Sequence, residues 1–354
     1  MPHNNRNALI QHIEKLRDGR TLVCLFNFDR LSEPYLNGIS TQFYGDIKEP
    51  LYRVLKASKK RNGIDLFLYT RGGDINAVWP IVSVLREFDR NFQVLVPYKC
   101  HSSGTLLALG AERIVLGPLS ELSPIDPSTG NAFNPQDAGN SSKKTSISVG
   151  DVRAYRAFVL EQLGGSEDAV VSPDELRPFI EKLTERVHPL ALGNVQRVSQ
   201  QIRQVAENLL ALHSNKTDNI PQMVDTLINR FHSHQHMLNR HEAKSILGAR
   251  VEFASARLTG ALDNLLLDYE ESYLLRHTFY AQQQLHGKAE AEVSHTGAVV
   301  ESQAESWQFQ TRARLRQPGA APAAQGQAAP QRRGIEIDIQ EQGWRRIVAT
   351  ADSP

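Results

Sequence analysis

The sequence predicts an α/β fold, because strand-like and helix-like segments alternate along its first third. Short apolar runs rich in β-branched and aromatic residues are expected to form strands at 20–28, 64–70, 92–98 and 113–117. Segments with helical spacing lie between or after them, at 51–62, 75–88 and 104–111. Strands that alternate with helices in this way are typical of parallel sheets with crossover connections.

The character of the chain changes after Gly130, where a polar loop without any period runs to residue 146. Helices are expected beyond it, at 152–163, 173–187, 190–212 and 254–280. Three positions carry a capping residue followed three places later by an acidic one, namely Ser148 with Asp151, Ser172 with Glu175 and Asn239 with Glu242. This spacing is the signature of a helix N-terminus.

The last part of the chain contains a segment rich in Pro, Ala, Gln and Gly at 317–334, which has the composition of a flexible linker. A strictly alternating segment follows at 335–339. We therefore expect an α/β core over 1–135, a helical extension over 136–285 that completes the core and makes oligomer contacts, and a tail over 286–354. The alternating segment could bind a protein partner by strand addition.

The composition excludes several classes of function. The formal net charge is +1, which gives no electrostatic reason to expect nucleic acid or an anionic membrane as a partner. Cys24 and Cys100 are the two cysteines, too few for a disulfide framework, which favours a reducing compartment. The first twenty residues lack an apolar leader segment, and no 18-residue window is apolar enough to span a membrane. The expectation is a cytoplasmic protein without a membrane span.

Two turns, each between a predicted strand and a predicted helix, contain residues that suit a functional site. The first is "YTRGGDIN", where Gly72 and Gly73 let the backbone approach a ligand and leave N–H groups free to face an anion. The second is "CHSSGT", where Ser102 and Ser103 stand at the start of a helix. Taken alone, the first is better explained as a tight strand-to-helix turn and the second as an ordinary N-cap serine. Together they offer a hydroxyl and free N–H groups, the two halves of an acyl-transfer site.

The segments "LYTRGGDINAVWPIV", "CHSSGTLLALGAERIVLGPLSELSPIDP" and "VHPLALG" resemble the ClpP-class serine peptidases. The resemblance is greatest to the serine dehydrogenase proteinases, which are related to signal peptide peptidase SppA. It implies a ClpP/crotonase-like spiral of ββα units with a helical C-terminal extension. It also implies that Ser102 is the nucleophile and that N–H groups of Gly73 (or Gly72) and Ser103 form the oxyanion hole.

The general base does not carry over from this resemblance. ClpP has a histidine on the strand after the nucleophile helix, and the corresponding residue in "SPIDP" is Asp126. Our first choice for the base is His188, oriented by Asp126. A Ser/Lys dyad of the SppA kind could instead use Lys143 or Lys144, if burial lowered the pKa of that lysine. His101 is adjacent to Ser102, so its side chain is expected to point away from the hydroxyl.

Other conspicuous residues favour structural roles. His232, His234, His236 and His241 cluster in sequence, but no HExxH pattern accompanies them, so no metal is expected. Cys100 is interpreted as a buried residue at the end of a strand. No phosphate-binding or dinucleotide-binding glycine pattern is present, and no cofactor is predicted.

The leading hypothesis is a serine peptidase that cleaves peptide or protein substrates through an acyl-enzyme at Ser102 and assembles into a homo-oligomer, as the resemblance implies. The alternative is a non-catalytic ClpP-like scaffold that binds partners. A crotonase-type acyl-CoA enzyme is disfavoured, because such enzymes do not place a serine nucleophile at this turn.

Overall fold

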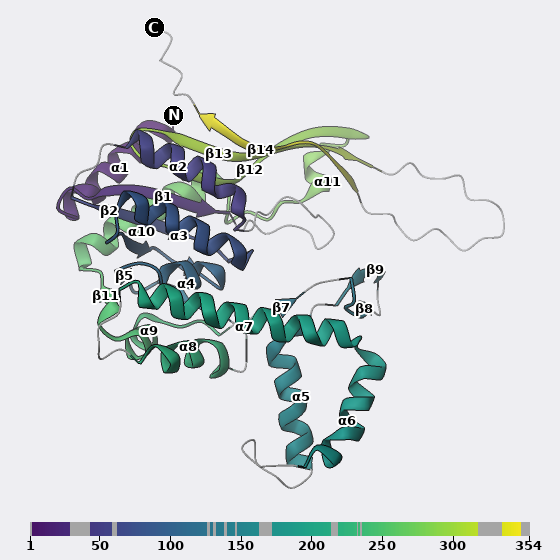
Figure 1. Cartoon of the computed structure of the whole chain (residues 1–354). Coiled ribbons are helices and arrows are strands. Elements are labelled where there is room, and N and C mark those ends of the chain that lie inside the picture. Colours follow the sequence, from purple (N-terminus) through teal and green to yellow (C-terminus); the bar gives the residue numbers. More distant parts are fainter. Residues whose placement is uncertain are drawn as a thin grey trace, which may run out of the picture. The chain divides into compact units, whose positions relative to one another are not determined.

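The computed structural model describes residues 2–28, 43–58, 62–125, 128–129, 132–137, 140–145, 147–162, 172–213, 219–231, 233, 236–317 and 335–347 (Figure 1). It contains two compact units. The first combines Met1–Leu122 with Asn239–Pro354, and the second is Ser123–Leu238.

An eight-stranded mixed sheet forms the centre of the first unit. Its strands, in spatial order, are β11 (Val251–Phe253), β5 (Arg113–Leu116), β3 (Gln93–Val96), β2 (Ile64–Tyr69), β1 (Thr21–Asn27), β12 (Glu290–Glu301), β13 (Ser306–Arg316) and β14 (Glu336–Ile347). The first five are parallel and the last three are antiparallel to their neighbours. The predicted α/β class, its four parallel strands and the extended segment after residue 335 are therefore confirmed.

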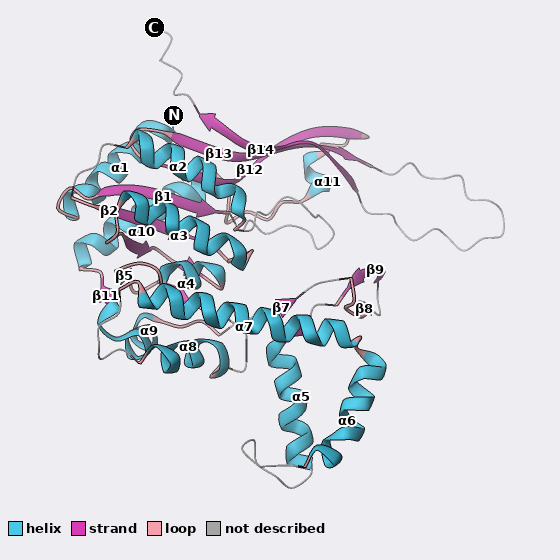
Figure 2. Ribbon diagram, in the orientation of Figure 1, coloured by secondary structure: helices cyan, strands magenta, loops and turns pink. Residues whose placement is uncertain are grey.

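Helices cover both faces of the parallel strands (Figure 2). The helices of this unit are α1 (Pro2–Leu16), α2 (Lys48–Ala57), α3 (Val78–Phe88), α4 (Ser103–Ala108), α9 (Arg240–Leu247), α10 (Ala256–Ser272) and α11 (Ala281–Gln284), with 3₁₀ turns at Gly45–Ile47, Ile75–Ala77 and Gly248–Arg250. Helices α2, α3 and α4 are successive crossovers, and the right-handed rule places them on one face. Helices α1 and α10 pack on the other, over a core that includes Leu22, Phe26 and Phe67.

The second unit is mainly helical and has a small core of its own. Its helices are α5 (Val149–Gln162), α6 (Pro173–Arg186), α7 (Pro189–Ala211) and α8 (Ile220–Asn229). Two short antiparallel pairs accompany them, β7 (Ser128–Thr129) with β10 (Ile147–Ser148), and β8 (Gln136–Asp137) with β9 (Asn140–Lys144). Ile147, Ala191 and Val195 form the buried core against which Val152 and Val187 pack.

The three predicted caps are confirmed by reciprocal hydrogen bonds. The backbone N–H of Ser148 donates to Asp151, whose own N–H donates to the Ser148 hydroxyl. Ser172 with Glu175 and Asn239 with Glu242 form capping boxes at the starts of α6 and α9. Because each cap satisfies N–H groups that a helix leaves unpaired, the acidic residue at this spacing marks the helix start.

The structure divides the chain elsewhere than the expected boundaries at residues 135 and 285. Strand β12, from the expected tail, pairs with β1, and β11 pairs with β5, so residues far apart in sequence share one sheet. The helix expected over 254–280 ends at Ser272, and Leu274 has a φ of 55°, which takes the chain out of the helix. Most of the predicted linker, residues 318–334, lies outside the described residues.

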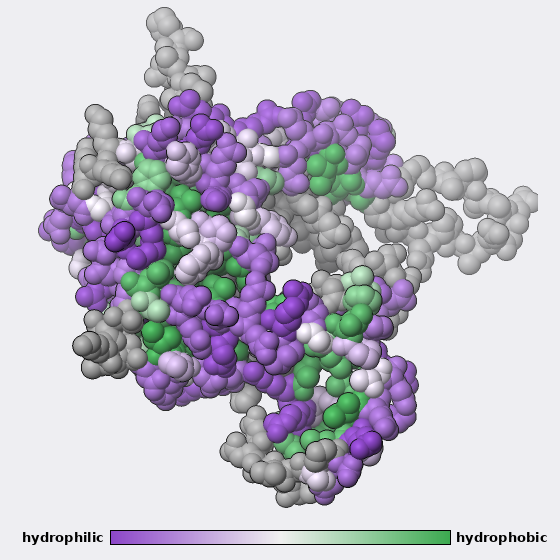
Figure 3. Space-filling view, in the orientation of Figure 1, coloured by the Kyte–Doolittle hydropathy of each residue, from purple (hydrophilic) through white to green (hydrophobic). Residues whose placement is uncertain are grey.

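On the face of the molecule in Figure 3, hydrophilic side chains predominate and apolar ones form small patches. Among the described residues, no helix has both the length and the apolar composition needed to cross a lipid bilayer.

Candidate active site

Ser102 lies at a strained turn between a short strand and a buried helix. Strand β4 (Lys99–Cys100) pairs in parallel with β6 (Glu121–Leu122), and α4 begins one residue after Ser102. The backbone of Ser102 has φ 51° and ψ −113°, a conformation that L-residues rarely adopt. Such strain costs about 1–3 kcal/mol, and it persists where surrounding contacts enforce it. The serine of a nucleophile elbow is presented on the same kind of sharp strand-to-helix turn.

Gly104 and Thr105 explain why the motif continues with Gly-Thr. A Cβ atom on Gly104 would lie 2.5 Å from Cγ2 of Thr70 and 3.3 Å from the sulfur of Cys100. The hydroxyl of Thr105 donates to the carbonyl of Cys100 at 2.7 Å. Only glycine therefore lets the first turn of α4 approach the end of β2, and the threonine ties that turn back to β4.

Gly72 brings the second glycine-containing turn against Ser102. Its φ is +97°, and a Cβ atom at this position would lie 2.8 Å from Cβ of Ser102 and 2.9 Å from the carbonyl oxygen of His101. The N–H of Gly72 donates to the hydroxyl of Thr70 at 3.0 Å. The two turns predicted to cooperate are thus in contact. Gly72 makes this contact possible because it has no side chain, and its own N–H is already bonded to Thr70.

The N–H groups of Gly73 and Ser103 are the donors left for an anion. Phe43 donates to the carbonyl of Gly72 and accepts from the N–H of Asp74, a parallel bridge that leaves the N–H of Gly73 on the side away from Phe43. Ser103 is the first residue of α4, whose leading N–H groups have no intrahelical acceptor. Within the described part of the chain, neither N–H makes a hydrogen bond. Two such donors beside a hydroxyl have the composition of an oxyanion hole.

The side chains next to Ser102 in sequence have other partners. Cys100 is fully buried, and burial raises the pKa of its thiol, which keeps the sulfur protonated and unreactive. The Nε2 atom of buried His101 lies 3.2 Å from a carboxylate oxygen of Glu121. Burial also raises the pKa of the Glu121 carboxyl, although the nearby Lys99 acts in the opposite direction. Both side chains are buried.

The predicted bases all belong to the second unit. His188 is exposed and is the N-cap of α7, where its Nδ1 accepts the N–H of Leu190 at 3.1 Å and its ring stacks on Phe133. Lys143 and Lys144 lie on β9, and the side chain of Lys144 is exposed. Asp126, the expected partner of His188, lies outside the described residues.

The histidine group of the sequence analysis forms no metal site among the described residues. His236 stacks on Phe231, and the ring of His241 meets Phe253 edge-on. His232 and His234 lie outside the described residues.

Two residues of the site carried no sequence signal. Phe43 holds Gly73 in place, and a Cβ atom on that glycine would come within 2.3 Å of the Phe43 carbonyl oxygen. Thr70 accepts from Gly72 and touches α4. Phe43 follows a stretch without any period, and Thr70 looks like the last residue of an ordinary strand, so only the fold reveals their positions.

Replacement of Gly72 with Ala is expected to lower any hydrolytic activity by about 100-fold or more, since it displaces the Ser102 turn and the oxyanion donors together. The φ of Gly72 adds a strain of about 1–2 kcal/mol for any other residue. Gly260 in α10 is the matched control, because a Cβ atom there meets nothing within 4 Å. Turnover of a fluorogenic peptide and thermal melting of both variants provide the measurements. Equal activity in the two variants would contradict the packing role of Gly72.

The chain is similar to several known proteins. Two uncharacterized proteins of Methanocaldococcus jannaschii are 35% and 28% identical to this chain over 125 and 127 residues. Each alignment covers 35% of this chain, and 44% or 42% of the relative, so the chain matches less than half of their length. Two solved structures of mutants of the 1510-N membrane-bound stomatin-specific protease are 14% identical, each with a TM-score of 0.36. They cover 65% of this chain and 80% and 76% of their own; the second holds a substrate peptide.

The sequence also matches the model of a protein family. Residues 3–154 match the family model described as ClpP-like SDH-type serine proteinase. This span includes Gly72, Gly73 and the whole "CHSSGT" turn. The resemblance that the motifs predicted is thereby confirmed, because this part of the chain is similar to the ClpP-like SDH-type serine proteinases.

Proposed function

We propose that the chain is a serine endopeptidase in which Ser102 forms an acyl-enzyme with peptide or protein substrates. The observation that carries this proposal is the strained turn of Ser102, which packs against Gly72, next in sequence to two N–H groups (Gly73 and Ser103) that make no hydrogen bond among the described residues. A proteinase has a use for a hydroxyl presented in this way, whereas a scaffold would gain nothing from the strain. The family match over residues 3–154 supports the same reaction class.

The reaction would follow the usual course of acyl transfer. The Oγ of Ser102 attacks the scissile carbonyl carbon while a base takes the hydroxyl proton, and the N–H groups of Gly73 and Ser103 hold the resulting oxyanion. Collapse of this intermediate breaks the C–N bond, and the protonated base gives its proton to the leaving amine. Water then hydrolyses the ester with the help of the same base, which returns Ser102 to its starting state.

A fluorophosphonate probe tests this proposal directly, because it reacts with activated serines. The probe is expected to label the folded wild-type chain, and mass spectrometry of the digested product should place the adduct on Ser102. Heat-denatured protein is the control and should remain unlabelled. An unlabelled native protein, or an adduct on another serine, would favour the non-catalytic scaffold.

We propose Lys143 as the base, because each alternative has a specific difficulty. The Nδ1 of His188 accepts a backbone N–H, so the neutral ring carries its proton on Nε2 and has no free acceptor nitrogen. The side chain of Lys144 is exposed, whereas a lysine base is expected to be buried. Lys143 is the neighbouring lysine on β9, and a base role requires its amine to be neutral.

Alanine variants of the three candidates discriminate between them. Lys143→Ala is expected to lower the rate of fluorophosphonate labelling by about 1,000-fold, as expected for loss of the group that activates a nucleophile. Lys144→Ala and His188→Ala should change it by less than about threefold. A large loss in His188→Ala with a normal rate in Lys143→Ala would instead establish the histidine as the base.

A further inference from the structure

Strand β14 forms an open edge of the eight-stranded sheet. It extends over twelve residues, Glu336–Ile347, and among the described residues its only strand partner is β13. Most of its side chains are exposed. On its outer side, alternate backbone N–H and C=O groups have no partner strand among the described residues, which makes a long edge of this kind a template for strand addition. β14 lies outside residues 3–154, so the family match does not account for it.

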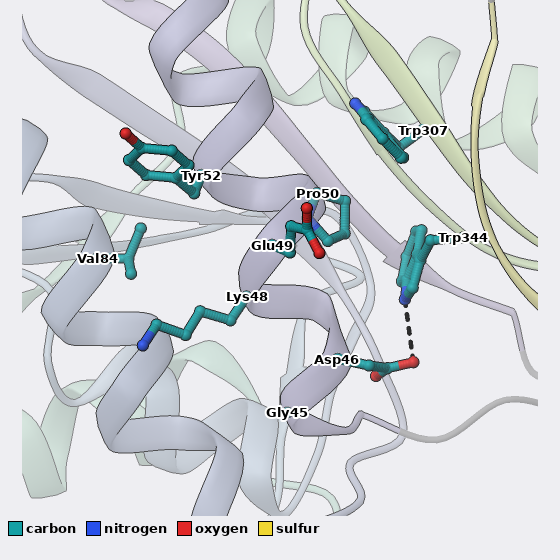
Figure 4. A pocket seen from close by; sticks show the side chains of 9 residues that line it. All are labelled: Gly45, Asp46, Lys48, Glu49, Pro50, Tyr52, Val84, Trp307 and Trp344. Atoms are coloured by element: carbon teal, nitrogen blue, oxygen red, sulfur yellow. Dashed lines mark hydrogen bonds between the residues drawn. The ribbon is translucent and has the colours of Figure 1, made fainter.

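Side-chain contacts hold this edge firmly in place. The indole N–H of Trp344 donates to Asp46 at 3.0 Å, and the Trp344 ring meets Phe309 edge-on. The Gln342 amide donates to the hydroxyl of Thr311. Figure 4 shows Trp344 and Trp307 on one side of a groove of about 550 Å³, with Asp46 and Glu49 close by. An edge anchored in this way is preorganised, so an added strand would lose less free energy in ordering it.

A bulge in β14 changes which of its side chains lie on each face of the sheet. Arg312 pairs with Glu341 and the next residue, Ala313, pairs with Ile339, so Gln340 is the extra residue. Counted across this bulge, Asp338 lies on the same face as Arg345, and Ile339 lies on the same face as Trp344. Ile339 is 43% exposed. One face therefore carries an acidic residue in the first half of the strand and a basic residue in the second half. The other face carries an apolar residue in each half.

Charge is segregated along the strand. Glu336, Asp338 and Glu341 lie in its first part, and Arg345 and Arg346 lie near its end, where they also pair with Glu341 and Glu305 of the same chain. If two copies of β14 were parallel and in register, like charges would face each other. If they were antiparallel, the acidic part of each copy would face the basic part of the other, which is the favourable arrangement.

We propose that β14 pairs antiparallel with β14 of a second copy of this chain, about a two-fold axis through Gln342. In this register Asp338 of each copy lies opposite Arg345 of the other, and Ile339 lies opposite Trp344. Both pairs occur twice because the interface is isologous. The pairing joins two eight-stranded sheets into one continuous sheet of sixteen strands and covers both open edges. A strand contact of this size gives a dimer with a Kd of about 1–10 μM, at the weak end of specific interfaces.

Charge exchange tests the register. Sedimentation velocity of the full chain between about 1 and 100 μM is expected to show a monomer–dimer equilibrium, in line with the micromolar affinity above. Asp338→Arg places arginines opposite each other and Arg345→Asp places aspartates opposite each other, so each variant alone should be monomeric. An equimolar mixture of the two should form a heterodimer, because each strand then complements the other. The double variant D338R/R345D should recover the wild-type equilibrium. Circular dichroism confirms that each variant is folded.

Cross-linking tests the position of the axis. Cys24 and Cys100 are both buried, so an added cysteine is the only accessible thiol among the described residues. In Gln342→Cys the two thiols face each other across the axis, and mild oxidation should give a disulfide-linked dimer. Asp338→Cys is the control, because its counterpart is Arg345 rather than itself, and it should remain mostly monomeric.

The sedimentation results distinguish the proposed pairing of β14 from other modes of association. A monomer at all concentrations would overturn the proposal, and so would a dimer that both single charge variants leave intact, since that dimer would use another surface. Loss of the dimer in each single variant with its return in their mixture would establish the antiparallel pairing of β14.

Discussion

Replacement of Ser102 with Ala is expected to reduce kcat/KM for a peptide substrate by about 10⁴-fold or more, the usual cost of removing the nucleophile of a serine hydrolase. The two N–H donors of Gly73 and Ser103 remain in this variant, so any residual rate reports the oxyanion hole alone. Cleavage of a fluorogenic peptide, followed at several enzyme concentrations, provides the measurement. Ser83→Ala is the matched control, since that serine is exposed on α3 and donates to the carbonyl of Trp79 in the same helix.

A second substitution at the same position separates strain from chemistry. Glycine tolerates the φ of 51° at residue 102, whereas alanine retains the strain of serine. Ser102→Gly is therefore expected to be inactive and more stable than Ser102→Ala by about 1 kcal/mol. If the glycine variant unfolds at lower denaturant concentration than the alanine variant, the turn is not strained and its geometry gives no support to a nucleophile. Activity retained in either variant would remove Ser102 from the mechanism.

The sequence predicted the parts of the fold and site that depend on short patterns. The parallel strands have both faces buried, so they read as continuous apolar runs. The two glycine-containing turns were recognisable because positive φ and close approach demand glycine. Their contact across Gly72 and Ser102 followed from the rule that the carboxyl ends of adjacent parallel strands meet at one edge of the sheet.

Other parts depend on contacts between distant segments and have weaker patterns. The first part of β12 alternates between exposed and half-buried side chains, and β12 and β13 each contain three charged residues, so their sequence resembles a solvated segment although the end of β12 is buried. Helix α1 carries few apolar residues, of which Ile10 and Ile13 are buried. The general base that accepts the proton of Ser102 also cannot be predicted from local sequence. The candidate bases lie 41 or more residues away along the chain, and their pKa values depend on burial.

The buried position of Arg6 leads to the largest expected effect on stability. Its side chain is 2% exposed, its Nε donates to Asp268 of α10, and its Nη1 donates to Glu301 of β12 at 3.3 Å. The guanidinium also lies 4.4 Å from the centre of the Tyr269 ring. Burial alone would lower the pKa of Arg6, but the neighbouring groups outweigh it and the pKa is raised. One side chain of α1 thus neutralises carboxylates from two other elements.

Arg6→Met is expected to lower the free energy of unfolding of the first unit by about 3–5 kcal/mol, the typical cost of leaving buried charges unpaired. Arg53→Met is the matched control. Arg53 pairs with Glu49 on the exposed side of α2, and such a pair contributes about 0–1 kcal/mol. Urea unfolding followed by tryptophan fluorescence suits the measurement, because Trp79, Trp307 and Trp344 all lie in the first unit. The second unit can unfold in a separate transition without obscuring it.

The double variant R6M/E301Q distinguishes lost packing from unpaired charge. If the cost of Arg6→Met arises mainly from the carboxylate left behind, neutralising Glu301 should recover about 1–2 kcal/mol, and the two substitutions will be non-additive. The recovery is expected to be incomplete, because Asp268 stays unpaired and the Glu301 carboxylate also accepts hydrogen bonds from Tyr269 and Ser306. Strictly additive losses would instead mean that Arg6 stabilises the unit through contact with the aromatic rings. In that case the packing between α1 and α10 would depend on the shape of the residue 6 side chain. Methionine, which has a similar length, would then already retain much of the packing contact that arginine makes.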